Sequence, residues 1–192
     1  MFDILQILLW SITYVLIIVA GFLSSDFKKV SMPYVAGVLN FAWEFCALWN
    51  SKGFWGHILW LSLDLFIVFF GYRYAACAKS KLIYTLSLIA STVLLLAVFT
   101  LPNGTLISVF AIDLIMAIWF IVDQKRLSPK LMIPIAATKL LGDLFAGIYY
   151  ANMSDFVLVA AIIVFICNLF YLCMCMESSG RVKTKSRKSK LS

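Results

Sequence analysis

The chain has 192 residues, of which 64% are hydrophobic and 13% charged, with a formal net charge of +7. Soluble globular domains have about 45–50% apolar and about 25% charged residues, so this composition excludes an ordinary soluble protein. It predicts an integral, multi-pass protein of a plasma-membrane or endoplasmic-reticulum type of membrane. The segments between the apolar stretches are too short to form a soluble domain, so any binding site must be built inside the membrane-embedded part.

Seven stretches resemble transmembrane helices, each of which needs about 20 apolar residues. In chain order they are Ile4–Leu23, Pro33–Trp49, His57–Tyr72, Leu82–Leu101, Leu106–Val122, Leu131–Tyr150 and Phe156–Met176. Pro33 opens the second stretch, at the position that proline favours in a helix. Pro102-Asn103-Gly104 predicts a tight turn between the fourth and fifth, and Pro134 lies in the first turn of the sixth, where it breaks few bonds. We therefore expect an all-α fold, a polytopic bundle of seven transmembrane helices.

Basic residues alternate between the two sides of this expected bundle. All Lys and Arg except Lys52 and Lys139 fall in the first, third and fifth connecting segments or in the tail. The positive-inside rule then predicts that the N-terminus is outside and the C-terminus is cytoplasmic. The chain divides into a seven-helix domain (residues 1–177) and a basic cytoplasmic tail (residues 178–192). The tail is expected to be disordered and to lie against anionic lipid, and no nucleic-acid partner is expected.

Four carboxylates lie inside the predicted spans, where each costs roughly 2.5–3.5 kcal/mol unless it is paired or used. They are Glu44, Asp64, Asp113 and Asp143. Counting from the span ends at 1.5 Å per residue, all four lie about 9–13 Å below the outer boundary. Their common depth predicts one polar chamber in the outer half of the bundle. Asn40 lies one helical turn before Glu44, so both side chains share a helix face.

Each of these residues also has a simpler interpretation. Lys139 precedes Asp143 by four residues, so the two can form an ion pair within one helix. Asp64 and Asp113 can be buried acids that accept hydrogen bonds from neighbouring helices. The single histidine, His57, is expected to be a wet polar residue at the outer interface. No clustered His, Cys and carboxylate pattern predicts a metal site, although the acid layer could hold a hard cation, and no cofactor is expected.

The second span carries the most specific motif in the chain, Asn40-Phe41-Ala42-Trp43-Glu44-Phe45. It resembles the N-x-x-W-E segment of the small membrane-bound terpene cyclases of fungal meroterpenoid and indole-diterpene pathways and their bacterial relatives. The segment from Trp60 to Asp64 is similar to that family's third span, and Lys139-Leu140-Leu141-Gly142 to its sixth. The family usually has an aspartate in the last span, three residues before a tyrosine. Here that position is Asn168, before Tyr171.

The resemblance implies a seven-span fold and a chemistry in which Glu44 acts as the acid. A buried carboxyl group favours its neutral form and can protonate a prenyl chain or its epoxide. Aromatic faces such as Phe41 and Trp43 would stabilise the resulting carbocations. Either Asp143 or Asp64 would replace the missing last-span acid, or the chain would no longer perform this reaction. The lipophilic substrate would enter from the bilayer, and the residues expected to bind it are Asn40, Phe41, Trp43, Asp113, Lys139, Asn168 and Tyr171.

Two other functions fit the same residues. The acid layer of a non-enzymatic transporter or small-molecule binding protein would bind a cation, an amine or protons. An isomerase acting on sterol-like lipids would use the same protonation and deprotonation steps.

Overall fold

The computed structural model describes residues 2–24, 32–50, 55–75, 78–127 and 131–189. Within these ranges the chain is all-helical, with seven α-helices and two short 3₁₀ helices. The α-helices are α1 (Phe2–Leu23), α2 (Tyr34–Asn50), α3 (Trp55–Tyr74), α4 (Ala78–Phe99), α5 (Gly104–Val122), α6 (Met132–Tyr150) and α7 (Asp155–Ser189). The 3₁₀ helices are η1 (Gln124–Arg126) and η2 (Ala151–Met153). Each predicted span corresponds to one α-helix, and the ends differ by a few residues except at the end of α7.

Six of the helices in the described part of the chain, all except α2, are long and apolar enough to cross a membrane. Large apolar side chains are exposed on their outer surfaces, for example Leu86, Val93 and Leu94 on α4. A soluble monomer rarely exposes contiguous apolar surface of this extent. The helices therefore have the outer surface that a membrane protein presents to lipid.

The helices form a closed ring with one helix outside it. Each helix packs on the next in the order α1, α3, α2, α5, α7, α6 and back to α1. The remaining helix, α4, packs on the outside against α2 and α5. The short helix α2 is thus enclosed by α3, α4 and α5. Its buried positions lie on all of its faces, so it needs little lipid-facing surface.

Small residues allow neighbouring helices to approach closely, as is usual for helix pairs in membranes. Gly142 and Ala146, four residues apart on α6, form such a pair of small residues. In the structure a Cβ atom added to Gly142 would lie 3.0 Å from Trp10 Cδ1 on α1. Ala146 is also buried. Gly142 therefore allows α6 to pack closely on α1.

The predicted turn between the fourth and fifth spans is present, and α5 follows it directly. Asn103 has a left-handed backbone with φ of 57°, and the Gly104 amide donates to the Leu101 carbonyl at 2.9 Å. A Cβ atom on Gly104 would lie 1.9 Å from the Val98 carbonyl oxygen, so only glycine fits there.

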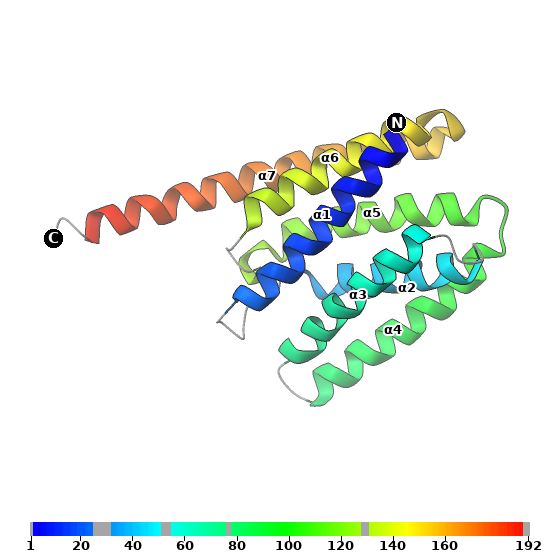
Figure 1. Cartoon of the computed structure of the whole chain (residues 1–192), viewed down its shortest axis with the longest axis horizontal. Helices are drawn as coiled ribbons and strands as arrows, with labels where there is room; N and C mark the ends of the chain where they lie inside the picture. The colour runs from blue at the N-terminus through cyan, green and yellow to red at the C-terminus, as the bar shows by residue number, and fades with distance from the viewer. Residues whose placement is uncertain (1, 25–31, 51–54, 76–77, 128–130, 190–192) are drawn as a thin grey trace.

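The last helix is longer than the sequence predicts, since α7 continues to Ser189 and projects beyond the bundle (Figure 1). The tail was predicted to be disordered. In the structure, the backbone of most of it continues the helix that starts in the bundle. Extending an existing helix avoids the nucleation cost that an isolated segment of this composition would meet.

Candidate functional site

A cavity of about 490 Å³ lies inside the ring of helices. Its wall comes from the beginnings of α1, α3 and α5 and the ends of α2 and α6, so it occupies the end of the bundle that holds the N-terminus (Figure 1). The volume is within the roughly 300–1,000 Å³ of small-molecule sites. Aromatic side chains form much of the wall, namely Trp10, Tyr14, Trp43, Trp60, Phe110, Tyr149 and Tyr150. Polar and charged groups enter the wall at Gln6, Asn40, Glu44, His57, Thr105 and Asp113.

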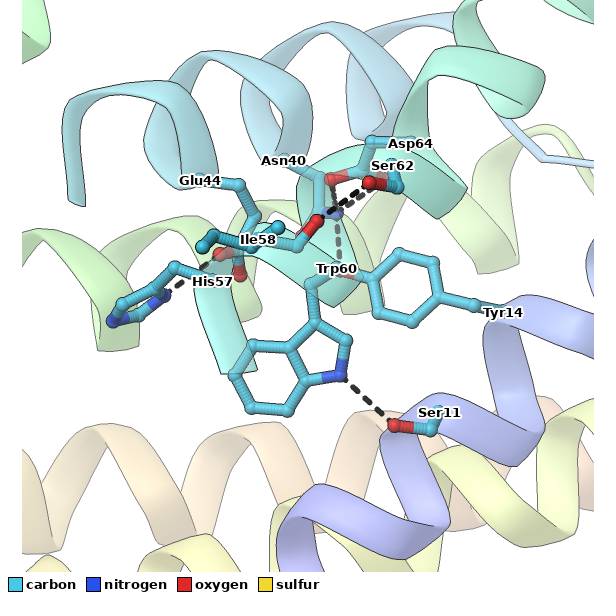
Figure 2. A network of polar contacts seen from close by, with 9 residues as sticks. All are labelled: Ser11, Tyr14, Asn40, Glu44, His57, Ile58, Trp60, Ser62 and Asp64. Carbon is cyan, nitrogen blue, oxygen red and sulfur yellow. Dashed lines mark hydrogen bonds and ion pairs between the residues drawn. The ribbon is translucent and has the colours of Figure 1, made fainter. Parts of the chain in front are cut away.

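Glu44 lies in this wall and is paired with a histidine. Nδ1 of His57 is 2.9 Å from Oε2 of Glu44, as Figure 2 shows. The side chain of Glu44 is 5% exposed and that of His57 is 16% exposed. His57, which was expected to be a wet interfacial residue, thus connects a buried carboxyl group to the less buried end of the bundle. The contact forms because α2 and α3 are antiparallel neighbours, which places the end of α2 beside the start of α3.

Two tryptophan rings contact the imidazole ring of His57. The ring centroid of His57 is 5.7 Å from that of Trp43 and 6.0 Å from that of Trp60. Each indole N–H in turn donates to a serine hydroxyl, from Trp43 to Ser108 at 3.0 Å and from Trp60 to Ser11 at 3.1 Å. We call Trp43, Trp60, Ser11 and Ser108 the histidine clamp. Because both indoles are hydrogen-bonded to other helices, the clamp fixes the direction of the imidazole.

Asn40 connects the cavity wall to a deeper acid. Its amide Nδ2 donates to both carboxyl oxygens of Asp64 at 2.8 Å, and also to the hydroxyl oxygen of Tyr14 (Figure 2). Asp64 is fully buried and does not line the cavity. Tyr14 does line it, although no pattern in the sequence singles it out. Asp64 therefore acts on the site through Asn40 and Tyr14 and not by direct contact with the cavity.

Asp113 is the second carboxyl group of the cavity wall. No described residue forms a hydrogen bond with its side chain. It is close enough to Asp143, Lys139 and Glu44 to interact with them electrostatically. Its carboxyl group is thus available to whatever occupies the cavity.

Asp143 belongs to a separate charged cluster behind the cavity wall. Nζ of Lys139 is 2.7 Å from Oδ2 of Asp143, and the amide of Asn168 donates to the same oxygen. The ammonium group also lies 4.9 Å from the centroid of Trp10, whose ring lines the cavity. The ion pair within α6 that the spacing allowed is therefore present. The cluster supports Trp10, but neither Lys139, Asp143 nor Asn168 lines the cavity.

Two further predicted substrate-binding residues lie away from the cavity. Phe41 lines a shallow apolar groove between α2 and α4. Tyr171 is buried in the core with its ring centroid 5.3 Å from that of Phe120. Of the four acids expected to share one chamber, Glu44 and Asp113 line the cavity, whereas Asp64 and Asp143 do not. Their helices turn Asp64 towards Asn40 and Asp143 towards Lys139 and Asn168.

Among the described residues, no group of three or more His, Cys, Asp or Glu side chains could hold a metal ion. Comparisons with protein-family models, curated proteins and solved structures find no match to this chain.

Proposed function

We propose that the chain is an integral membrane enzyme similar to the small terpene cyclases, in which Glu44 protonates a prenyl chain or its epoxide to start cyclisation. The observation that supports this most directly is the combination of the Glu44 carboxyl group and aromatic walls in one cavity of about 490 Å³. An acid is needed to generate a carbocation, and aromatic faces stabilise it without reacting as nucleophiles.

The surroundings of Glu44 favour the form in which it holds a proton. Charged groups lose hydration when they are buried, so the neutral pair of carboxylic acid and imidazole is preferred over an ion pair in an apolar cavity. Glu44 is only 4% exposed and is bordered by tryptophan rings. A carboxylic acid in this position can donate to an oxygen atom or a double bond of a bound chain.

Asp113 is the group we assign to accept the final proton. It lines the same cavity as Glu44, whereas Asp64 and Asp143 face away from it. This assignment answers the question raised by Asn168, where the family has an acid. Asn168 donates to Asp143 in the cluster behind Trp10, so an acid at that position would not face the cavity.

The membrane arrangement that goes with this function has seven spans, with α2 as the short enclosed one. The N-terminus is outside and the basic C-terminal tail is cytoplasmic, in contact with anionic lipid. The cavity then lies in the outer half of the bilayer. A lipophilic substrate reaches it from the bilayer and not from a soluble carrier.

A binding or transport function for an organic amine is the second candidate, and the availability of Asp113 favours it. A cavity with two carboxyl groups and several tryptophan and tyrosine faces also suits a lipophilic ammonium group. The two functions can be distinguished by product analysis, since an enzyme forms a new product and a binding protein releases the ligand unchanged.

The test is to incubate membranes containing the protein with candidate prenylated epoxides and with the matching alkenes, and to analyse the products. Glu44→Gln keeps the shape of the side chain but removes the acidic proton, so product formation should fall by about 10²–10⁴. Glu177→Gln is the matched control, because Glu177 is exposed on α7 and lies outside the cavity. Full turnover by a normally inserted Glu44→Gln variant would reject the acid role. Binding and uptake of lipophilic amines would then be measured.

A further inference from the structure

The contact between His57 and Glu44 is oriented by several surrounding side chains. His57 is the third residue of α3, so the imidazole lies near the end of the bundle, and its side chain is more exposed than that of Glu44. Nδ1 faces Oε2 of Glu44 at 2.9 Å (Figure 2). The histidine clamp keeps the ring in that direction. Four side chains from four different helices are thus used to orient one imidazole.

An acid that gives away its proton must regain one before it can act again. Glu44 is almost fully buried, and the side chains around it in the wall are mostly apolar or acidic. The titratable groups that line the cavity with His57 are Glu44 on α2, Asp113 on α5, Tyr14 on α1 and the pair Tyr149 and Tyr150 on α6. Among them, Glu44 has a carboxyl oxygen 2.9 Å from Nδ1 of the imidazole.

We propose that His57 is a proton relay that returns a proton from water to Glu44 after each donation. This inference rests on the proposed acid role of Glu44. A proton from water binds Nε2, the ring nitrogen that does not face Glu44, and gives the imidazolium form. The Nδ1–H bond then breaks as the proton passes to Oε2 of the Glu44 carboxylate, which leaves neutral imidazole and a neutral carboxylic acid. Exchange of ring protons with water restores the starting tautomer, so the net change is the transfer of one proton from water to Glu44.

Histidine suits this step because its ordinary titration lies close to neutral pH and its two nitrogens can accept and release a proton at different places. The greater exposure of His57, 16% against 5% for Glu44, gives the direction of the relay. Removing the imidazole should leave the first protonation of substrate intact and slow every later one.

The experiment follows the protonation of Glu44 directly. After a rapid change of pH, infrared spectroscopy records the carboxylic acid band of the purified protein, which is assigned to Glu44 by its absence in Glu44→Gln. We expect His57→Ala to slow the return of this band by about 10² or more, the lower end of what positioned proton transfer contributes. Imidazole added to the buffer should restore part of the rate. Ser62→Ala is the control, because Ser62 is exposed on the same helix and donates only to the Ile58 carbonyl within α3.

Turnover measurements separate this proposal from the proposed function. In single-turnover reactions with enzyme protonated beforehand, His57→Ala should match the unchanged protein, while its steady-state rate falls. A slowed infrared signal without any product from the prenyl substrates would leave the relay standing and reject the cyclase function. Equal reprotonation rates in His57→Ala and the unchanged protein would overturn the relay.

A second variant, His57→Gln, tests the relay if His57→Ala does not fold. His57→Gln fills the histidine clamp and keeps a hydrogen-bond donor beside Glu44, but it cannot carry a proton. If His57→Gln folds, its reprotonation should be as slow as that of His57→Ala. If it reprotonates normally, or if both variants fail to fold and imidazole does not rescue them, His57 has a structural role and the relay is rejected.

Discussion

Replacing Asn40 by leucine tests whether the deep acid is held in place by this single amide. The Asn40 amide donates to both oxygens of Asp64 at 2.8 Å and to Tyr14, and Asp64 has no exposed surface. Asn40→Leu therefore leaves a buried carboxyl group without its donor. Such a loss costs about 1–3 kcal/mol for a neutral group and about 3–5 kcal/mol for an unpaired charge. We expect the free energy of unfolding to fall by about 2–4 kcal/mol.

A double-mutant cycle makes this reasoning specific. Asp64→Leu alone should cost less than Asn40→Leu, since the amide keeps Tyr14 as an acceptor. The double variant should cost about 1–3 kcal/mol less than the sum of the single ones, because no buried carboxyl group is then left without its donor. The assay is equilibrium unfolding in mixed detergent micelles. Asn50→Leu, the same change at an exposed position of α2, is the control and should alter stability by no more than about 0.5 kcal/mol. Additive costs of the two single variants would refute the pairing.

Four other outcomes are expected. Lys139→Met should lower the free energy of unfolding by about 3–5 kcal/mol, because Asp143 loses its ion-pair partner, and detergent unfolding measures this. Gly71→Ala should cost about 1–3 kcal/mol in the same assay, since its Cβ would lie 2.7 Å from the Tyr84 hydroxyl. Asn168→Asp replaces a donor to Asp143 by an acid and should lower the melting temperature without raising product formation. Reporters fused to the two ends should read as external at the N-terminus and cytoplasmic at the C-terminus; the same side for both would reject seven spans.

The helices and the turn before α5 could be predicted because a bilayer leaves few choices. Without water, backbone groups must be satisfied within each segment, so an apolar stretch of the right length becomes a helix. The left-handed residue at Asn103 follows from the Pro-Asn-Gly order for a similar local reason. Depth along a helix is equally readable, since it needs only a count of residues from the helix end.

The direction in which a side chain points around its helix could not be read in the same way. A residue count predicts a depth for Asp64 and Asp143, but their faces are set by contacts with Asn40, Lys139 and Asn168. The spacing of four residues predicts the contact of Lys139 with Asp143. Asn40 and Asn168 lie on other helices than the acids they contact, so no local pattern predicts those contacts. Tyr14 is 26 residues from Asn40, so only the packing of α1 against its neighbours brings them together.

His57 is an intermediate case, because a signal for it was present. Glu44 and His57 are 13 residues apart and lie on either side of the short connection between α2 and α3. Antiparallel helices joined by a short connection place residues near the end of the first beside residues near the start of the second. An antiparallel arrangement of the two predicted spans therefore predicts that His57 lies close to Glu44. Its position at the end of a predicted span led instead to the expectation that His57 is a hydrated residue at the interface.

The distribution of partners among the four acids indicates which of them serve stability and which serve chemistry. Asp64 accepts from Asn40, and Asp143 accepts from Lys139 and Asn168, so the protein itself offsets the cost of burying both. Glu44 is held by a residue that can exchange protons, and Asp113 has no hydrogen-bond partner among the described residues. The two acids that are not locked by permanent donors are the same two that line the cavity. A carboxyl group whose only role was structural would gain from a fixed donor, whereas one that acts on a bound molecule must keep its oxygens free to reach it. This contrast is the physical reason for assigning the reaction to Glu44 and Asp113 and the support of the cavity wall to Asp64 and Asp143.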